Sequence, residues 1–233
     1  MKRAIVILAG GRGSRFGYDK PKQFARMNGK PMFIWSLMVP MSLNFDHIVL
    51  VFNEDWMDEA ISELEMEDIH GVELIGGGRT RQLSVWNALK YLERCDVDVV
   101  LIHDANRPFA TCDLYRRVVS DLSKYDSCVP IVKPRDSVYE MEDSVVLGLM
   151  KRESLGLIQT PQGFRYDLIM KCHKMAIEEG KEDFPDDSSI LLHFGYPIHT
   201  TRGELTNLKI TFEEDMSLAK YILQFLESKS IKF

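Results

Sequence analysis

The sequence predicts an α/β fold: a three-layer sandwich in which helices cover both faces of a Rossmann-like, mostly parallel sheet. Short runs of β-branched residues alternate with longer segments of helical pattern, which is the rhythm of repeated βαβ units. One of these runs, at residues 98–102, is almost continuously apolar, as expected of a central parallel strand covered on both faces. With 45% hydrophobic and 27% charged residues, the chain has the composition of an ordered globular protein.

The individual elements follow from the spacing of apolar side chains, which is continuous or alternating in strands and has a period near 3.6 in helices. Strands are expected at residues 4–8, 47–52, 72–75, 97–103 and 127–132. Amphipathic helices are expected at residues 80–94, 111–122, 166–179 and 213–227. Residues 32–43 also have a helical pattern, but Pro40 lacks a backbone N–H, so this helix is expected to kink or end near Val39.

The segment 136–149 breaks this rhythm. Two short strand-like runs, 136–141 and 145–149, flank a polar turn at 142–144 and predict a hairpin that projects as a β-arm. The chain contains no Gly/Ser-rich linker, internal repeat or low-complexity tract. Residues 1–233 are therefore expected to form a single domain that carries this arm.

Composition excludes several classes of function. The net charge of −6 argues against nucleic acid as a partner, because such binding needs clustered Lys and Arg. The four cysteines are well separated and contain no CxxC pair, so neither a zinc site nor a disulfide framework is indicated. Without a run of 18 apolar residues or a signal-peptide pattern, we expect no membrane partner and a cytoplasmic location.

A glycine-rich loop follows the first predicted strand. Its glycines let backbone N–H groups crowd around an anion, and nearby cations add positive charge. These residues are Gly10, Gly11, Gly13, Arg15 and Lys22. The loop lacks the P-loop pattern GxxxxGK[ST], and its spacing GxGxxxG differs from the dinucleotide fingerprint GxGxxG. Its glycines and nearby cations favour a triphosphate-binding loop, and an ordinary strand-to-loop turn is the alternative interpretation.

Two further segments carry candidate residues. The glycines at residues 76–78 open a helix whose amides and dipole could hold a base edge or a phosphate, whereas capping of that helix by Thr80 is the alternative. Asp104 ends the predicted central strand, where α/β sheets bind their ligands, and is a candidate magnesium ligand or a turn cap. His103 is expected to be a hydrogen-bonded core imidazole, and the pair Asp186-Asp187 is expected to start a helix.

Taken together, the motifs resemble one family over nearly the whole chain. In order they are Leu8-Ala9-Gly10-Gly11-x-Gly-x-Arg15, Pro21-Lys22-Gln23, Gly77-Gly78-x-x-Arg81-x-x-Ser84-Val85, His103-Asp104-x-x-Arg107-Pro108, Thr160-Pro161-Gln162, Asp186-Asp187 and Asn207-x-Lys209-Ile-Thr211. This series resembles the polyol-phosphate cytidylyltransferases, which include the methylerythritol phosphate and ribitol-5-phosphate enzymes. The resemblance implies transfer of CMP from CTP to a polyol phosphate with Mg²⁺ and release of pyrophosphate. It also implies a homodimer in which the arms, here residues 133–152, complete each other's sites.

The resemblance also assigns roles to residues. The CTP-binding set is Leu8, Ala9, Gly10, Gly11, Gly13, Gly77, Gly78, Arg81, Ser84, Asp104 and Ala105, with Asp104 as the magnesium ligand. The residues matched to catalysis are Arg15 and Lys22, which stabilise the transition state, and Arg152 and Lys209, which position the acceptor phosphate. Arg107 and Ser137 join Arg152 and Lys209 in the acceptor site. The residue types suit the chemistry, because a phosphate oxygen needs no base to attack and fixed cations stabilise a pentavalent α-phosphate.

Departures from the methylerythritol pattern bear on the acceptor. The arm has Ser137 and Tyr139 where a threonine and a lysine are usual, and Gly10 replaces a common alanine. The segments Gly29-Lys30-Pro31 and Asn207-Leu208-Lys209 resemble the ribitol branch more closely. These differences favour ribitol 5-phosphate, with 2-C-methyl-D-erythritol 4-phosphate as a close second. Other sugar-phosphate or molybdopterin nucleotidyltransferases share the opening glycine motif but not the later ones. A non-catalytic nucleotide-binding protein would have no need of the four matched cations.

Overall fold

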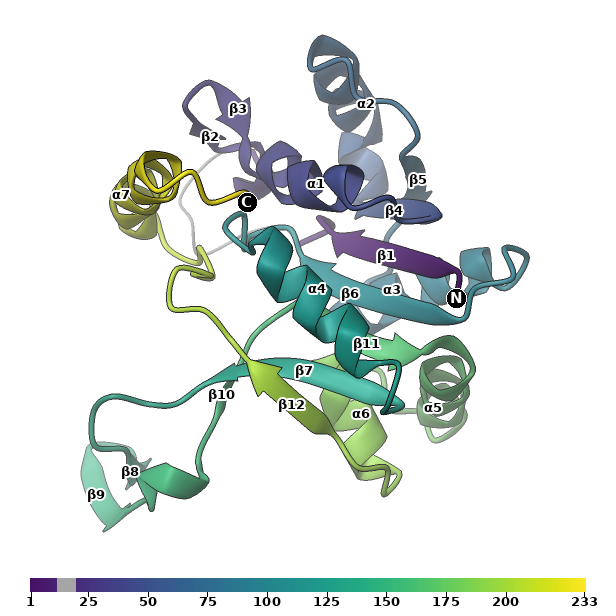
Figure 1. Ribbon diagram of the computed structural model, residues 1–233. Helices are drawn as coiled ribbons and strands as arrows, with labels where there is room; N and C mark the ends of the chain where they lie inside the picture. The colour runs from purple at the N-terminus through teal and green to yellow at the C-terminus, as the bar shows by residue number, and fades with distance from the viewer. Residues whose placement is uncertain (12–19) are drawn as a thin grey trace.

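The computed structural model describes residues 1–11 and 20–233 (Figure 1). Within them, an eight-stranded sheet has the order β10-β7-β11-β6-β1-β4-β5, with β12 paired to β7. Its strands are β1 Arg3–Leu8, β4 His47–Phe52, β5 Glu73–Gly76, β6 Val99–Asp104, β7 Ser127–Val132, β10 Leu157–Ile158, β11 Gln162–Arg165 and β12 His199–Arg202. Two small hairpins pair β2 Arg26–Met27 with β3 Lys30–Pro31, and β8 Tyr139–Glu142 with β9 Val145–Leu149.

Helices surround this sheet. They are α1 Met32–Ser42, α2 Met57–Met66, α3 Arg81–Leu92, α4 Cys112–Asp121, α5 Tyr166–Glu178, α6 Asp187–His193 and α7 Asp215–Ser228, with the 3-10 turns η1 Lys22–Phe24, η2 Glu54–Trp56 and η3 Arg152–Ser154. Among the described helices, none is long and apolar enough to cross a membrane.

The centre of the sheet is parallel, as predicted. β1 runs parallel to β4 and β6, and β4 runs parallel to β5. Two strands of the sheet run against this direction: β11 lies antiparallel between β6 and β7, and β10 pairs antiparallel with β7. Because the central strands are parallel, the carboxyl ends of β1, β4, β5 and β6 meet at one edge.

Alternation along the strands produces the three layers. In β1, Ile5 and Ile7 pack with α1, α2 and α4 on one face, whereas Ala4 and Val6 pack with α3, α5 and α6 on the other. A third cluster attaches α7 at the side of the sheet, where Leu223 and Ile210 are fully buried (Figure 1). The predicted three-layer α/β class is therefore confirmed, and α7 also anchors the segment that carries Lys209.

One helix runs further than its sequence suggested. We expected the segment 32–43 to kink or end near Val39, but α1 continues through Pro40 to Ser42. A proline removes a single helical hydrogen bond, and here Leu37, Val39 and Pro40 itself are buried in the core. Packing of this apolar face maintains the helix, and Leu43 closes it by donating to the Pro40 carbonyl at 3.1 Å.

The predicted hairpin lies apart from the main sheet (Figure 1). It turns at Asp143, whose φ of +50° is left-handed, and β8 and β9 pair with each other alone among the described residues. Much of its surface is apolar: Val145, Leu147 and Leu149 are 61%, 55% and 67% exposed. A two-stranded hairpin with such a surface is marginally stable in water on its own.

Candidate active site

The carboxyl ends of the central strands are tied together by backbone hydrogen bonds just beyond the strands. Ala9 donates to the carbonyl of Val51 at 2.8 Å, and Ala105 donates to that of Leu8 at 3.0 Å. Gly77 donates to Phe52 at 2.7 Å. Ala9, Gly77 and Ala105 were predicted to bind CTP. Their amides instead hydrogen-bond to the neighbouring strands, which extends the sheet and fixes the loops that follow the strands.

A cavity of about 450 Å³ opens at this edge, and we call it the strand-end cavity. Its lining is Leu8, Gly10, Gly11, Lys22, Gln23, Asn53, Gly78, Arg79, Thr80, Arg81, Ser84, Asp104, Asn106 and Lys209. Nine of the residues predicted from the sequence are among them. Residues that are far apart in the chain, Lys22 and Lys209, thus meet in one cavity.

Other predicted site residues lie elsewhere within one chain. Arg107 donates to the carbonyls of Asn207 at 2.9 Å and Ile158 at 3.5 Å, outside the lining of the cavity. Ser137 and Arg152 are exposed on the arm, where Arg152 donates to the Arg135 carbonyl at 2.8 Å. The predicted residues Gly13 and Arg15 lie outside the described residues.

Lys22 is the first residue of η1 and lines the strand-end cavity. Its Nζ donates to the carbonyl of Ile210 at 3.1 Å, the residue that follows Lys209. The same carbonyl accepts from the side chain of Asn106 at 2.9 Å, and the backbone of Ile210 donates to the Asn106 carbonyl at 2.8 Å. The end of β6, the Lys209 segment and η1 therefore converge on the backbone of one residue, Ile210.

The second glycine segment is organised by its own helix. Thr80 caps α3 by accepting from the Leu83 amide at 3.1 Å, which confirms the capping interpretation. Ser84, one turn into α3, accepts from the Gly78 amide at 3.0 Å. A Cβ at Gly78 would lie 2.5 Å from the Leu83 Cβ, so only glycine lets this loop fold so closely onto the helix.

Asp104 is held between two cations. Its Oδ1 accepts from Arg81 Nε at 3.1 Å and its Oδ2 accepts from Lys209 Nζ at 2.9 Å. Burial alone would raise the pKa of this carboxyl, but Arg81 and then Lys209 hold it well below its usual range. Asp104 is therefore ionised at neutral pH, and it fixes the position of Lys209.

The charge network continues away from the cavity. Arg81 NH1 donates to Asp187 Oδ2 at 2.8 Å, and the fully buried Asp187 contacts His173 Nε2 through Oδ1 at 3.2 Å. Arg81 NH2 is buried and has no hydrogen-bond partner among the described residues. Asp187 is also the first residue of α6, which Asp186 caps, so the expected helix start is confirmed.

His103, the residue before Asp104 in β6, places its imidazole in the core. His103 is fully buried, its Nδ1 lies 2.9 Å from the Thr160 hydroxyl and its Nε2 lies 3.1 Å from the Arg107 carbonyl. Burial lowers the pKa of His103 to about 4, so the ring is neutral. Nε2 then donates to the carbonyl, Nδ1 accepts from Thr160, and Thr160 in turn accepts from the Asp104 amide at 3.1 Å. His103 is the hydrogen-bonded core imidazole that we expected.

This burial predicts acid lability of the fold. The pKa of His103 is about 4 in the folded protein against an ordinary value of 6.5, so between these values the unfolded chain binds the proton and the folded chain does not. The stabilisation is complete above pH 6.5 and declines as the pH falls towards 4. Linkage gives a loss of about 2 kcal/mol in the free energy of unfolding by pH 5. Urea unfolding at pH 7.5 and pH 5 measures it.

The variant His103→Gln supplies the control, because a glutamine cannot titrate in this range. Its free energy of unfolding should fall less between pH 7.5 and pH 5 than that of the unaltered protein. An equal fall in both proteins would show that His103 does not cause the effect. The carboxyls of Asp104 and Asp187 also have lowered pKa values, but they lose their stabilising charge only at more acidic pH.

Sequence reasoning missed several residues of the cavity. They are Gln23, Asn53, Arg79, Thr80 as a lining residue, and Asn106. Asn53 directly follows β4, so the rule that selected Asp104 after β6 would also have selected it. Gln23 was part of the quoted motif Pro21-Lys22-Gln23 but received no role, because its contacts depend on how the chain folds.

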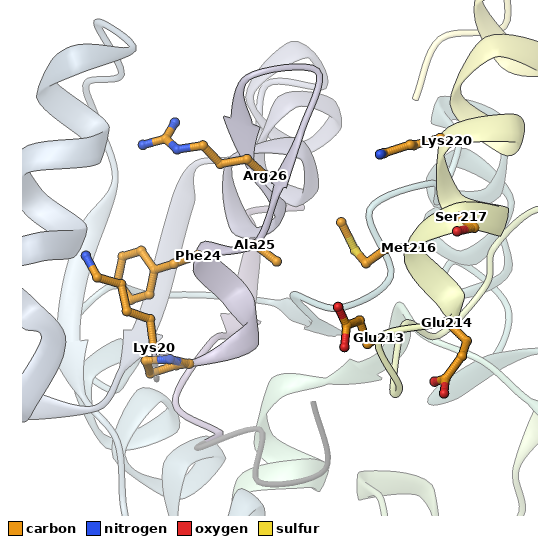
Figure 2. Close-up of a pocket in the computed structure, with 10 residues that line it drawn as sticks. Lys20, Phe24, Ala25, Arg26, Glu213, Glu214, Met216, Ser217 and Lys220 are labelled. Atoms are coloured by element: carbon orange, nitrogen blue, oxygen red, sulfur yellow. The ribbon is translucent and has the colours of Figure 1, made fainter. Parts of the chain in front are cut away.

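A second hollow, of about 760 Å³, separates η1 and β2 from α7 (Figure 2). None of the predicted site residues lines it. Lys20 and Arg26 form ion pairs with Glu59 and Glu63, and in Figure 2 the guanidinium of Arg26 points away from Lys220 on α7. Glu213 and Glu214 also line this hollow, whereas Asp104 is the one carboxylate among the described residues that line the strand-end cavity, so the hollow offers an anion less positive charge.

Comparisons of the sequence with known proteins match the chain to one family. The family model for 2-C-methyl-D-erythritol 4-phosphate cytidylyltransferase (IspD) matches residues 3–225. A relative of that name from Aquifex aeolicus is 37% identical over 219 residues, covering 94% of this chain and 96% of its own. Another from Thermosipho africanus is 35% identical over 215 residues, covering 91% and 94%. The chain belongs to the 2-C-methyl-D-erythritol 4-phosphate cytidylyltransferase family.

Solved structures of this family agree. The 4-diphosphocytidyl-2C-methyl-D-erythritol synthase of Anaerococcus prevotii superposes with a TM-score of 0.83 at 29% identity, covering 96% of both chains. The cytidylyltransferase of Thermus thermophilus gives 0.77 at 27% identity, covering 96% of this chain and all of its own. The protein is thus a cytidylyltransferase that uses CTP and a polyol phosphate. The preference for ribitol 5-phosphate receives no support, since these relatives are methylerythritol phosphate enzymes.

Proposed function

We propose that the protein transfers CMP from CTP to 2-C-methyl-D-erythritol 4-phosphate and releases pyrophosphate. The names of its relatives support this acceptor. The observation that carries the proposal is the convergence of Lys22, Lys209 and Arg81 with a glycine loop on one cavity at the carboxyl ends of the strands. Such a cavity suits two anions that must be brought together.

In this reaction an oxygen of the acceptor phosphate attacks the α-phosphorus of CTP, and the bond to the β-phosphate oxygen breaks. No proton has to be removed from the nucleophile. Lys22 places positive charge beside the α-phosphate, where negative charge accumulates, and Arg15 shares this role in the proposal. Lys209, held by Asp104, offsets repulsion between the acceptor phosphate and the triphosphate.

Magnesium is part of the proposal, with Asp104 as its protein ligand. Asp104 is the one carboxylate among the described residues that line the cavity, and each of its oxygens already accepts one hydrogen bond. An ionised carboxylate of this kind fits Mg²⁺, which takes one or two carboxylates and otherwise phosphate oxygens and water. When bound, the ion would neutralise part of the triphosphate charge.

Gly10 no longer argues for ribitol 5-phosphate. A Cβ added at Gly10 would have the Asn53 nitrogen as its nearest neighbour at 3.7 Å, which is an ordinary contact. Glycine and alanine therefore both fit this position, and the residue does not distinguish the two acceptors. The other differences are the segments Gly29-Lys30-Pro31 and Asn207-Leu208-Lys209 and the change at Ser137 and Tyr139 on the arm, where Ser137 retains a hydroxyl.

We also propose that residues 1–233 form one nucleotidyltransferase domain and that residues 133–152 are a dimerisation arm. The apolar side chains of β9 have nothing to cover them within the described part of one chain. A second copy of the chain would bury them. In that homodimer, Ser137 and Arg152 contribute to the acceptor site of the partner, and Arg107 and Lys209 contribute from the subunit that holds CTP.

Release of pyrophosphate from CTP tests the acceptor. With 2-C-methyl-D-erythritol 4-phosphate, ribitol 5-phosphate and glycerol 3-phosphate as a panel, we expect the first to give a kcat/KM at least about tenfold above the others, since polar groups built for one substrate reject its analogues. The assay is run with and without Mg²⁺, and with UTP and GTP in place of CTP.

A higher kcat/KM for ribitol 5-phosphate would overturn the proposed acceptor. Full turnover in the presence of excess chelator would overturn the role of the divalent ion.

A further inference from the structure

We propose that Gln23 is a positioning residue that orients the start of the first glycine loop, residues 9–11, for the triphosphate of CTP. Its side-chain amide holds the carbonyl groups of Ala9 and Gly11, and so turns the N–H of Gly10 towards the strand-end cavity. The inference rests on the proposed function of this cavity as the CTP site.

The contacts of Gln23 use its donor capacity in full. A glutamine amide carries two N–H groups, and Nε2 of Gln23 donates to the carbonyl of Ala9 and to that of Gly11, the latter at 2.6 Å. Gln23 is only 3% exposed, so these bonds lie inside the protein. One side chain therefore holds the described start of the loop at two points of its backbone, Ala9 and Gly11.

The geometry of the peptide unit links these bonds to the cavity. The carbonyl of Ala9 and the N–H of Gly10 belong to one trans peptide, in which the two groups point in opposite directions. Holding the carbonyl towards Gln23 therefore directs the Gly10 N–H away from Gln23. Gly10 lines the strand-end cavity, and its N–H donates to no other described residue. An amide presented in this way is a ready donor to a phosphate oxygen.

The orientation of the amide is determined by its surroundings. Rotated by 180°, its oxygen would face two carbonyl oxygens, which is unfavourable. In the observed orientation Oε1 is buried and has no hydrogen-bond partner among the described residues. Buried polar atoms are normally paired, so the two bonds donated by Nε2 must outweigh the cost of leaving Oε1 without a described partner.

Gln23 is fixed to the core by its neighbour. Phe24 packs against Phe52 and Phe33, with ring centroids 5.3 Å and 5.7 Å away. The same short turn, η1, carries Lys22 on the other side of Gln23. Gln23 therefore also sets the distance between the glycine loop and the cation proposed to stabilise the α-phosphate.

Two variants separate positioning from simple packing. Gln23→Met keeps the size and removes both donors, and we expect the Kd for CTP with Mg²⁺, measured by calorimetry, to rise about tenfold or more. Gln23→Glu places a carboxylate against two carbonyl oxygens and should be weaker still at pH 8. Near pH 6 a share of the introduced carboxyl group is protonated and regains one O–H donor, because these oxygens raise its pKa. The affinity of this variant relative to wild type should then recover severalfold, whereas that of Gln23→Met should stay constant.

Gln82→Met is the matched control. Gln82 is another buried glutamine that donates to a backbone carbonyl, that of Lys181 at 2.9 Å, and it does not line the cavity. It should lower the melting temperature without changing the Kd for CTP more than twofold. Either of two results would overturn the inference: a Kd within twofold of wild type for Gln23→Met, or the same pH dependence for both Gln23 variants. A wild type that binds CTP yet transfers no CMP would contradict the proposed function alone.

Discussion

Replacing Lys22 by alanine should lower the turnover number by about 100-fold or more while the fold remains intact, since a single transition-state donor typically contributes that much. Lys22 lies at the surface of the strand-end cavity, and its hydrogen bond to the Ile210 carbonyl is not part of the core. The loss should therefore fall on the chemical step. Pyrophosphate release at saturating CTP and acceptor measures it, with circular dichroism to verify the fold.

Lys20 provides the control for Lys22→Ala. It is two residues away, pairs with Glu59 and lines the separate hollow beside α7 rather than the cavity (Figure 2). Lys20→Ala should keep turnover close to wild type. Arg15→Ala is expected to behave like Lys22→Ala if the two share their role. Near-wild-type pyrophosphate release by Lys22→Ala would contradict the proposed role of Lys22 in stabilising the transition state.

The sequence predicted well those strands and helices that have a clear pattern of apolar residues within their own segment. The strands β4 and β7 have the bounds that their apolar runs indicated, and the predicted starts and ends of α3 and α5 are displaced by no more than two residues. The strands β10, β11 and β12 were not predicted, because each has only two to four residues and is held by pairing with β7 or β6 rather than by its own pattern. Helix α2 was also missed, although Ala60 and Leu64 form its buried stripe.

The same distinction applies to the site. Asp104 was found because it ends a central strand, a position that βα topology makes functional, and Lys22 was found because it is a cation close to a glycine-rich loop. The ion pairs that fix Asp104 come from Arg81 on α3 and Lys209 near the C-terminus, separated from it by 23 and 105 residues. No local pattern encodes the extension through Asp187 to His173, because it exists only after α5 and α6 have docked on the sheet. The motifs of the resemblance include Arg81, Asp104 and Lys209, but a motif does not show that these side chains contact each other.

The largest consequence of the proposed dimer concerns the arm. Substituting Leu147 and Leu149 by glutamate should convert the dimer to a monomer, because the apolar surface that a partner would cover becomes charged. Turnover should fall by about 100-fold or more, since Ser137 and Arg152 would no longer reach a partner's site. Light scattering coupled to size exclusion reports the mass, and pyrophosphate release reports activity. A monomeric variant with full turnover would show that each chain completes its own site.

Mixing two inactive variants tests directly whether the arm acts between subunits. Lys22→Ala damages the cavity and Arg152→Ala damages the arm, so in a heterodimer one site contains both defects and the other contains neither. If subunits exchange freely, half the dimers are mixed and each has one intact site, so activity should recover to about a quarter of wild type. If Arg152 serves the cavity of its own chain, every site carries at least one defect and mixing restores nothing. The recovery therefore depends on where the arm reaches, and a loss of stability in either variant cannot imitate it.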